Sequence, residues 1–206
     1  SHIDSSDQFQ IYRALFLYWR AEAQYRGNEE LNALTSIREA IAILDDDPKA
    51  GQLKARLYLR LGRLYIYLPL AESQAALDKS LALAGVYNQH DVEADVMITK
   101  AWIALNHTYD IQKGISFVQK GLALSQEYDL PIQQIRAHRV ASYLYRRLHN
   151  KSASLNHAKQ TLTLSQKYGL ADQERIALYS LGLLNYRVQN DWRAALEPMR
   201  ESRRVT

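Results

Sequence analysis

The chain has 206 residues, 26 basic and 22 acidic side chains, a formal net charge of +4 and no cysteine. This length suits one compact domain, and the lack of cysteine excludes disulfide bonds, thiolate chemistry and sulfur-ligated metal sites. No apolar run approaches the roughly 20 residues that a membrane-spanning helix needs, so we expect no membrane insertion. We expect a cytoplasmic protein, with the periplasmic sensor region of a membrane-anchored parent as the alternative.

Both ends of the chain resemble cut ends. The opening Ser1-His2-Ile3 has neither an initiator methionine nor a basic-then-apolar signal, and the chain stops at 203–206 inside a helical pattern. We interpret residues 1–6 as a remnant of cloning. Residues 7–206 are then a single helical repeat domain, excised from a larger protein.

A unit of two amphipathic helices recurs along the chain, at about 7–46, 48–86, 88–128, 131–168 and 171–206. Apolar residues recur at i, i+3, i+4 and i+7, as in Leu155, Ala158 and Leu162, which is the helical period. The stretches 122–130 (LALSQEYDL) and 162–170 (LTLSQKYGL) show the repeat directly, 40 residues apart. A self-match at a fixed period predicts a repeat architecture.

Small residues mark the same positions in every unit. The second helix carries two of them seven residues apart, and the first helix carries one about twenty residues upstream. The pairs are Ala33/Ala40, Ser73/Ser80, Gly114/Gly121, Ser154/Thr161 and Ala195/Ser202, and the upstream residues are Ala21, Gly62, Ala101, Ser142 and Gly182. These positions predict a close approach of two helix backbones in each unit.

Turn-forming residues separate the predicted helices. Pro48 and Pro131 suit the first turn of a following helix, and Gly169 suits a left-handed C-cap. The turns inside the units are marked by Gly27-Asn28, Asn106-His107-Thr108, His149-Asn150 and Gln189-Asn190-Asp191. Pro198 falls in the middle of the last predicted helix, which we expect it to kink or end.

These units resemble the tetratricopeptide repeat (TPR), whose first helix carries an aromatic residue, then Leu-Gly, then Tyr. The matching residues are Tyr58, Leu61, Gly62 and Tyr65 in a first helix and Ala33 and Ala40 in a second. The period near 40 and the joint at 168–170 are similar to the long TPR variant of bacterial signal-transducing regulators. The resemblance implies an all-α fold, a right-handed superhelical solenoid of about five antiparallel helix pairs.

In that family the first helices line a concave groove that binds a partner. Carried over to this chain, the lining contains Arg56, Arg63, Tyr67, Trp102, Arg136, Arg139, Tyr143, Arg146, Arg147, Tyr186 and Arg187. Arg136, Arg139, Tyr143 and Arg146 share one helix face. Guanidinium groups beside a phenol favour carboxylate or phosphate ligands, with simple solvation of a helix face as the alternative.

Patterns for catalysis or metal binding are missing from the sequence. No i, i+4 histidine pair around a glutamate occurs among His90, His107, His138, His149 and His157. There is also no nucleophile elbow, phosphate-binding loop or dinucleotide fingerprint. We therefore expect no enzyme, no catalytic residue, no metal and no cofactor. Nucleic acid is not an expected partner, because basic residues cluster only in the fourth unit and the C-terminal tail.

Charge is distributed unevenly along the chain. Residues 1–50 hold five basic and nine acidic residues, whereas residues 151–206 hold nine basic and five acidic. Such ends favour head-to-tail self-association, with ordinary surface scatter as the alternative.

The predicted function is a scaffold that binds a protein or peptide, with an acidic partner favoured by the arginines of the fourth unit. We expect it to be the sensory or interaction module of a larger bacterial signal-transduction or transcription-regulatory protein. A small-ligand or signal-peptide sensor and a self-assembly module are the alternatives.

Overall fold

A computed structural model describes residues 5–44, 47–64, 68–189 and 191–205, with only the backbone described for 5–7 and 187–189. Within these ranges the chain is helical and has no β-strand, which confirms the predicted all-α class. None of the helices described is long and apolar enough to cross a membrane. The chain divides into two compact units, Ser1–Thr99 and Lys100–Thr206, called here the N-terminal and the C-terminal unit.

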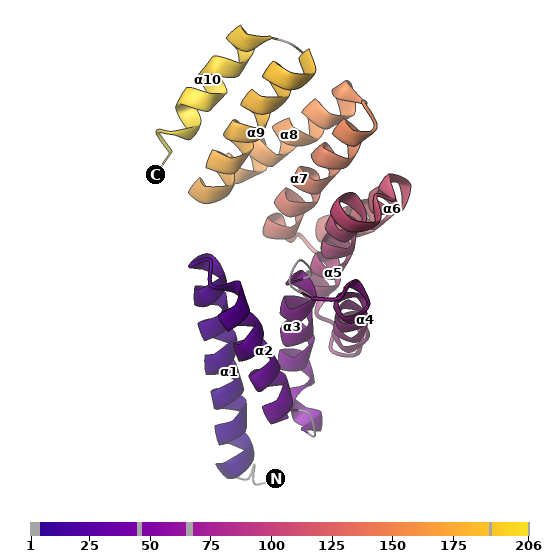
Figure 1. The fold of residues 1–206 in the computed structure, drawn as a ribbon, viewed down its shortest axis with the longest axis vertical. Helices are drawn as coiled ribbons and strands as arrows, with labels where there is room; N and C mark the ends of the chain where they lie inside the picture. The colour runs from indigo at the N-terminus through magenta and orange to yellow at the C-terminus, as the bar shows by residue number, and fades with distance from the viewer. Residues whose placement is uncertain (1–4, 45–46, 65–67, 190, 206) are drawn as a thin grey trace. The chain divides into compact units, whose positions relative to one another are not determined.

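Ten α-helices lie in the described ranges (Figure 1). In the N-terminal unit they are α1 (Ser5–Arg26), α2 (Glu30–Leu44), α3 (Gly51–Arg63) and α4 (Leu70–Val86), with a 3-10 turn at Pro48–Ala50 before α3. The helix α5 (His90–Ile103) crosses the boundary between the units and continues as a π-helical turn at Ala104–Thr108. The C-terminal unit then contains α6 (Ile111–Glu127), α7 (Pro131–Arg147), α8 (Lys151–Lys167), α9 (Ala171–Gln189) and α10 (Trp192–Ser202).

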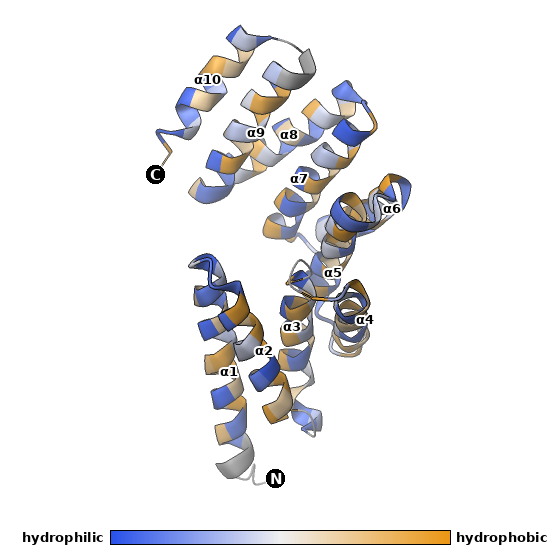
Figure 2. Cartoon of the chain, viewed as in Figure 1, coloured by the Kyte–Doolittle hydropathy of each residue, from blue (hydrophilic) through white to orange (hydrophobic). Residues whose placement is uncertain are grey.

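Consecutive helices pack as antiparallel pairs, as the repeat predicted. The helix α1 packs on α2, α3 on α4, α7 on α8 and α9 on α10. The second helix of a pair also packs on the first helix of the following pair, as in α2 with α3, α6 with α7 and α8 with α9. Polar and apolar residues alternate along the helices (Figure 2), as amphipathic helices in such a layer require.

The predicted small residues lie where the two helices of a pair meet, and all of them are buried. The Ser73 hydroxyl of α4 donates to the Gly62 carbonyl of α3 at 2.9 Å. In the same way, the Ser154 hydroxyl of α8 donates to the Ser142 carbonyl of α7 at 2.9 Å. A short side chain on one helix thus reaches the backbone of the other, which is possible only where the side chains between them are small.

Several of the predicted turns close through a residue in the left-handed conformation. Gly169 has a φ of 63°, which confirms the predicted C-cap, and Asn28, Asn88 and His149 also have positive φ. Pro131 occupies the first turn of α7, as expected. The turns therefore follow from local residue chemistry.

Pro198 does not end the last helix, because α10 continues through it to Ser202. Proline has no N–H to donate to the carbonyl four residues earlier, which here belongs to Ala194. The side-chain amide of Asn185 in α9 donates to that carbonyl at 3.0 Å. The neighbouring helix therefore satisfies the acceptor that the proline leaves open.

Gly62 provides a test of the close approach. A Cβ atom at Gly62 would lie 2.5 Å from Leu77 Cγ and 3.3 Å from the Ser73 carbonyl oxygen. Because Leu77 is fully buried, we expect Gly62→Val to lower the free energy of unfolding by about 2 kcal/mol, a typical cost of overpacking. Urea denaturation followed by circular dichroism measures the change.

Gly85→Ala is the matched control, since Gly85 is an exposed glycine of α4 whose added Cβ would meet only Glu93 Oε1, at 3.6 Å. Alanine is the better helix former, so this change should stabilise the protein by up to about 1 kcal/mol. Equal destabilisation by the two substitutions would contradict close helix approach as the constraint at Gly62.

Candidate functional site

The side chains predicted on the fourth unit form one connected surface in the C-terminal unit. Arg139, Tyr143 and Arg146 recur along α7 at i, i+4 and i+7, which places them on one face. The Arg146 guanidinium lies over the Tyr143 ring, 5.0 Å from its centroid, and the Trp102 ring lies 5.4 Å from the Tyr143 ring. The hydroxyls of Tyr143 and Ser180 are hydrogen-bonded at 3.2 Å. We call these five residues the Tyr143 surface.

The helix α9 borders this surface and extends it. Arg139 Nη1 donates to Gln173 Oε1 of α9 at 3.4 Å. Tyr179 and Tyr186 of the same helix are more than half exposed. The cavity between Arg139, Tyr143 and their neighbours measures only about 10 Å³, the space of one water molecule. The Tyr143 surface therefore offers contacts to an extended segment, and its own cavity is too small for a ligand.

The stretch 131–170, which contains α7 and α8, holds no acidic residue. Its seven basic residues are Arg136, Arg139, Arg146, Arg147, Lys151, Lys159 and Lys167. Any carboxylate that binds one of these side chains must come from outside the stretch. The sequence contains this signal, but the small net charge of the whole chain, +4, conceals it.

The predicted arginines of α3 are in a different electrostatic situation. In the N-terminal unit, Arg56 binds Asp91 at 2.8 Å and Arg63 binds Asp95 at 2.7 Å, both carboxylates belonging to α5. Asp95 is buried and Arg63 is partly buried. The charges of these two guanidinium groups are therefore already balanced within the unit.

The other predicted lining residues lie beside the Tyr143 surface or outside the described side chains. Arg136 and Arg147 are on α7, where Arg147 is exposed. Tyr186 lies on α9, as given above. Tyr67 and the side chain of Arg187 fall outside what the structure describes.

Two side chains that hold the Tyr143 surface together were not predicted from the sequence. Gln173 and Ser180 accept or share hydrogen bonds with Arg139 and Tyr143 across the gap between α9 and α7. They are seven residues apart, the spacing of one helix face, and this was the signal that could have identified them.

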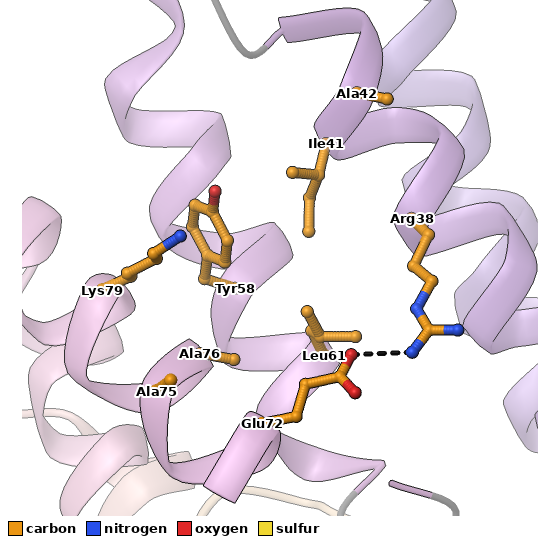
Figure 3. A pocket seen from close by; sticks show the side chains of 9 residues that line it. All are labelled: Arg38, Ile41, Ala42, Tyr58, Leu61, Glu72, Ala75, Ala76 and Lys79. Atoms are coloured by element: carbon orange, nitrogen blue, oxygen red, sulfur yellow. Dashed lines mark hydrogen bonds and ion pairs between the residues drawn. The ribbon is translucent and has the colours of Figure 1, made fainter. Parts of the chain in front are cut away.

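A pocket of about 410 Å³ opens in the N-terminal unit between α2 and α4, with α3 contributing to its wall (Figure 3). Lys79 lies over the Tyr58 ring at 5.3 Å, and on the opposite side Arg38 and Glu72 form an ion pair of 2.7 Å. The apolar lining consists of Ile41, Ala42, Tyr58, Leu61, Ala75 and Ala76. Sequence reasoning missed this pocket because most of its lining comes from second helices.

A histidine pair joins α7 to α8. The Nδ1 atoms of His138 and His157 are 2.9 Å apart, and the Tyr145 ring stacks on His157. Burial lowers the pKa of His138 to about 4, with a smaller contribution from the charge of His157, and burial also lowers the pKa of His157. Both imidazoles are therefore neutral at pH 7. Among the residues described, no three His, Cys, Asp or Glu side chains gather as a metal-ligand set.

Comparisons with known proteins agree with this architecture. Neither a protein-family model nor a curated protein matches the sequence. Among solved structures, the chain is similar to the apo form of RapI, with a TM-score of 0.68 and 17% identity over 94% of this chain and 53% of RapI. It is also similar to BtubC (BKLC) from P. vanneervenii, with a TM-score of 0.69 and 15% identity over 98% of this chain and 88% of BtubC.

The fold is a TPR-like helical repeat. This confirms the coarser part of the predicted resemblance, since sequence identities this low concern the fold alone. The chain spans about half the length of RapI, 53%.

The histidine pair predicts a loss of stability on mild acidification. The folded-state pKa of His138 is about 4 against an ordinary value of 6.5, so the unfolded chain binds more protons between these values. The neutral form of His138 therefore adds to the free energy of unfolding. This addition is complete above pH 6.5 and is lost as the pH falls from 6.5 toward 4. Melting temperatures recorded from neutral pH downward should therefore decrease over this window.

His157→Gln removes one of the two titrating groups and should flatten this pH dependence. His149→Asn is the control, because His149 is exposed and its left-handed backbone suits asparagine. If the melting temperature of the His157 variant falls with pH as steeply as that of the parent protein, the histidine pair is not the source of the pH dependence.

Proposed function

We propose that the chain is a partner-binding scaffold that holds an acidic protein or peptide segment against the Tyr143 surface. One observation carries the proposal: a stretch of seven basic and no acidic residues contains the row Arg139, Tyr143 and Arg146. A guanidinium group binds a carboxylate through two parallel N–H···O bonds, which combine charge with a defined geometry. The row supplies two such groups, with an aromatic ring between them.

The aromatic side chains add an apolar contribution to this binding mode. Tyr143 packs against both Trp102 and the Arg146 guanidinium, so its ring is already held in place. Tyr179 and Tyr186 are 53% and 54% exposed on α9 and are free to cover apolar groups of a ligand. A segment that alternates acidic and apolar residues fits this combination of contacts.

The arginines of the N-terminal unit are poorer sites for the same ligand. A carboxylate that approached Arg56 or Arg63 would have to displace Asp91 or Asp95 from ion pairs of 2.8 and 2.7 Å. Breaking a partly buried pair leaves a charge uncompensated, which is costly. The acidic ligand is therefore assigned to the C-terminal unit.

We extend the proposal to the context of the chain. Its period near 40 residues, similar to the long TPR variant, supports an interaction module of a larger bacterial regulator that passes the bound state to an output domain. The segments that flank this chain in its parent test the idea. An adjacent cyclase, kinase or helix-turn-helix domain is expected, and a parent without an output domain would contradict it.

Loss of the two arginines should weaken binding of an acidic ligand. Using a fluorescein-labelled peptide of alternating glutamate and leucine, we expect Arg139→Gln with Arg146→Gln to raise the dissociation constant about 10- to 100-fold. This is the range for losing one or two charge-assisted hydrogen-bonded contacts. Fluorescence anisotropy measures the constant, and circular dichroism checks that the variant is folded.

Lys151→Gln with Lys159→Gln is the matched control for this experiment. It removes the same amount of charge from the same basic stretch, but from exposed positions on α8, the second helix. Binding should change far less than in the arginine variant. Equal losses would mean that the peptide responds only to overall charge, and an unbound peptide would exclude an acidic ligand of this kind.

The pocket between α2 and α4 favours a second candidate function, the sensing of a small ligand. Its volume of about 410 Å³ lies in the usual range for small-molecule sites. The apolar lining and the Lys79 ammonium at its edge fit a ligand with an apolar body and one anionic group.

Octanoate serves as the test ligand for this pocket. Binding at about a hundredfold excess over the dissociation constant should stabilise the protein by about 2.7 kcal/mol, seen as a rise in melting temperature. Ala75→Leu fills the pocket and should abolish the rise, whereas Ala71→Leu, also at an exposed alanine of α4, should preserve it. A rise that persists in the Ala75 variant would place the ligand elsewhere.

A further inference from the structure

The helix α1 carries four large aromatic side chains that the described residues leave uncovered. Phe9, Tyr12, Phe16 and Trp19 are 65%, 60%, 64% and 62% exposed. Their spacings of three, four and three residues place them on a single face of the helix, called here the α1 stripe. The opposite face of α1 packs against α2. Contiguous apolar patches of this kind mark interaction sites.

The positions that correspond to Phe16 and Trp19 of the stripe are buried in later helix pairs. When the first helices are aligned on their small residues, Phe16 corresponds to Leu57 of α3 and to Ala137 of α7, and Trp19 corresponds to Val140 of α7. Leu57, Ala137 and Val140 are fully buried. The second helix of the preceding pair packs on these helices, α2 on α3 and α6 on α7. The α1 stripe therefore occupies the face on which this fold packs another helix.

We propose that the α1 stripe binds the α1 stripe of a second copy of this chain, in an antiparallel pair with two-fold symmetry. The spacing three, four, three reads the same in both directions. An antiparallel copy therefore places Phe9 of one chain opposite Trp19 of the other, and Tyr12 opposite Phe16. A two-fold interface requires this reciprocity, in which each residue meets the same partner from both sides.

The area of the stripe is sufficient for such a pair. A buried aromatic side chain covers about 150–250 Å², and at the exposures given above four of them offer roughly 500 Å² per copy. Two copies then bury roughly 1,000 Å², the lower limit for a specific interface. The nearest arginines on α1, Arg13 and Arg20, are both held on Glu39 of α2, at 3.0 and 3.3 Å.

The last helix of a second copy is a poorer partner for the stripe. Its exposed large apolar residues are Trp192 and Leu196. However, Arg203 stands at the position that Ile41 holds in α2 and Leu162 holds in α8. Apolar contact at that position would bury a charge, which costs free energy unless a carboxylate is supplied. We therefore assign the α1 stripe of a second copy, and not its α10, as the partner of the α1 stripe.

Sedimentation velocity at several protein concentrations, in low and in high salt, tests the pairing. We expect a monomer–dimer equilibrium that persists in high salt, because salt does not screen apolar contacts. Phe16→Gln with Trp19→Gln should raise the dimer dissociation constant by about 100-fold or more, as the loss of two buried aromatic contacts does. Both positions are exposed in the single chain, so the variant should keep its helical circular dichroism spectrum.

Trp192→Gln with Leu196→Gln, which removes exposed apolar residues from α10, is the matched control and should leave the dimer unchanged. Mixing distinguishes the two geometries further. Through a two-fold interface, immobilised parent protein should capture the Phe16/Trp19 variant much more weakly than it captures the parent, because two of the four aromatic pairs are lost, whereas a head-to-tail interface would capture both equally through α10. A monomer at all concentrations, a dimer lost in high salt, a dimer retained in the stripe variant or capture of that variant as strong as that of the parent would each overturn the proposal.

Discussion

The close approach of two helices within each pair is the constraint on which the rest of the structure depends. At Gly62 and at Ser142 the backbone carbonyl of the first helix accepts a hydrogen bond from a serine of the second, at 2.9 Å in both pairs. A larger residue at these points would separate the helices, and each second helix also supports the first helix of the next pair. The positions that recur every 40 residues are therefore committed to packing, and specific function is left to those that do not recur.

The first helices show this division most clearly. In the N-terminal unit, Arg56 and Arg63 of α3 are balanced by Asp91 and Asp95, so their charges serve the stability of the unit. In the C-terminal unit, α7 carries its arginines through a stretch with no carboxylate, and Tyr143 joins them to α9 through Ser180. The same scaffold thus pairs Arg56 and Arg63 with carboxylates of α5, whereas any carboxylate that binds the arginines of α7 must come from outside residues 131–170. This difference is why the acidic ligand is assigned to one unit and not to the other.

The α1 stripe adds a second kind of surface, whose chemistry is apolar where that of the Tyr143 surface is charged. The two surfaces share no residue, so pairing through α1 uses none of the side chains of the Tyr143 surface. A paired protein would then present two copies of it. A partner with two acidic segments would bind such a pair more tightly than a single copy, because the second contact forms within one complex. The proposed pairing and the proposed binding would in that case reinforce each other.

The sequence by itself determined the all-α class, the helix pairs and the small residues between them, since periodicity and turn chemistry act over a few neighbouring residues. It also placed Arg139 and Tyr143 on one face of one helix for the same reason. Only the tertiary structure decided that Arg56 is bound by Asp91, that Ser180 holds Tyr143, and that Phe16 of α1 is uncovered where its counterparts are buried. The partner of a charge and the cover of an apolar face come from another helix, and no local pattern specifies which residues that helix will bring into contact.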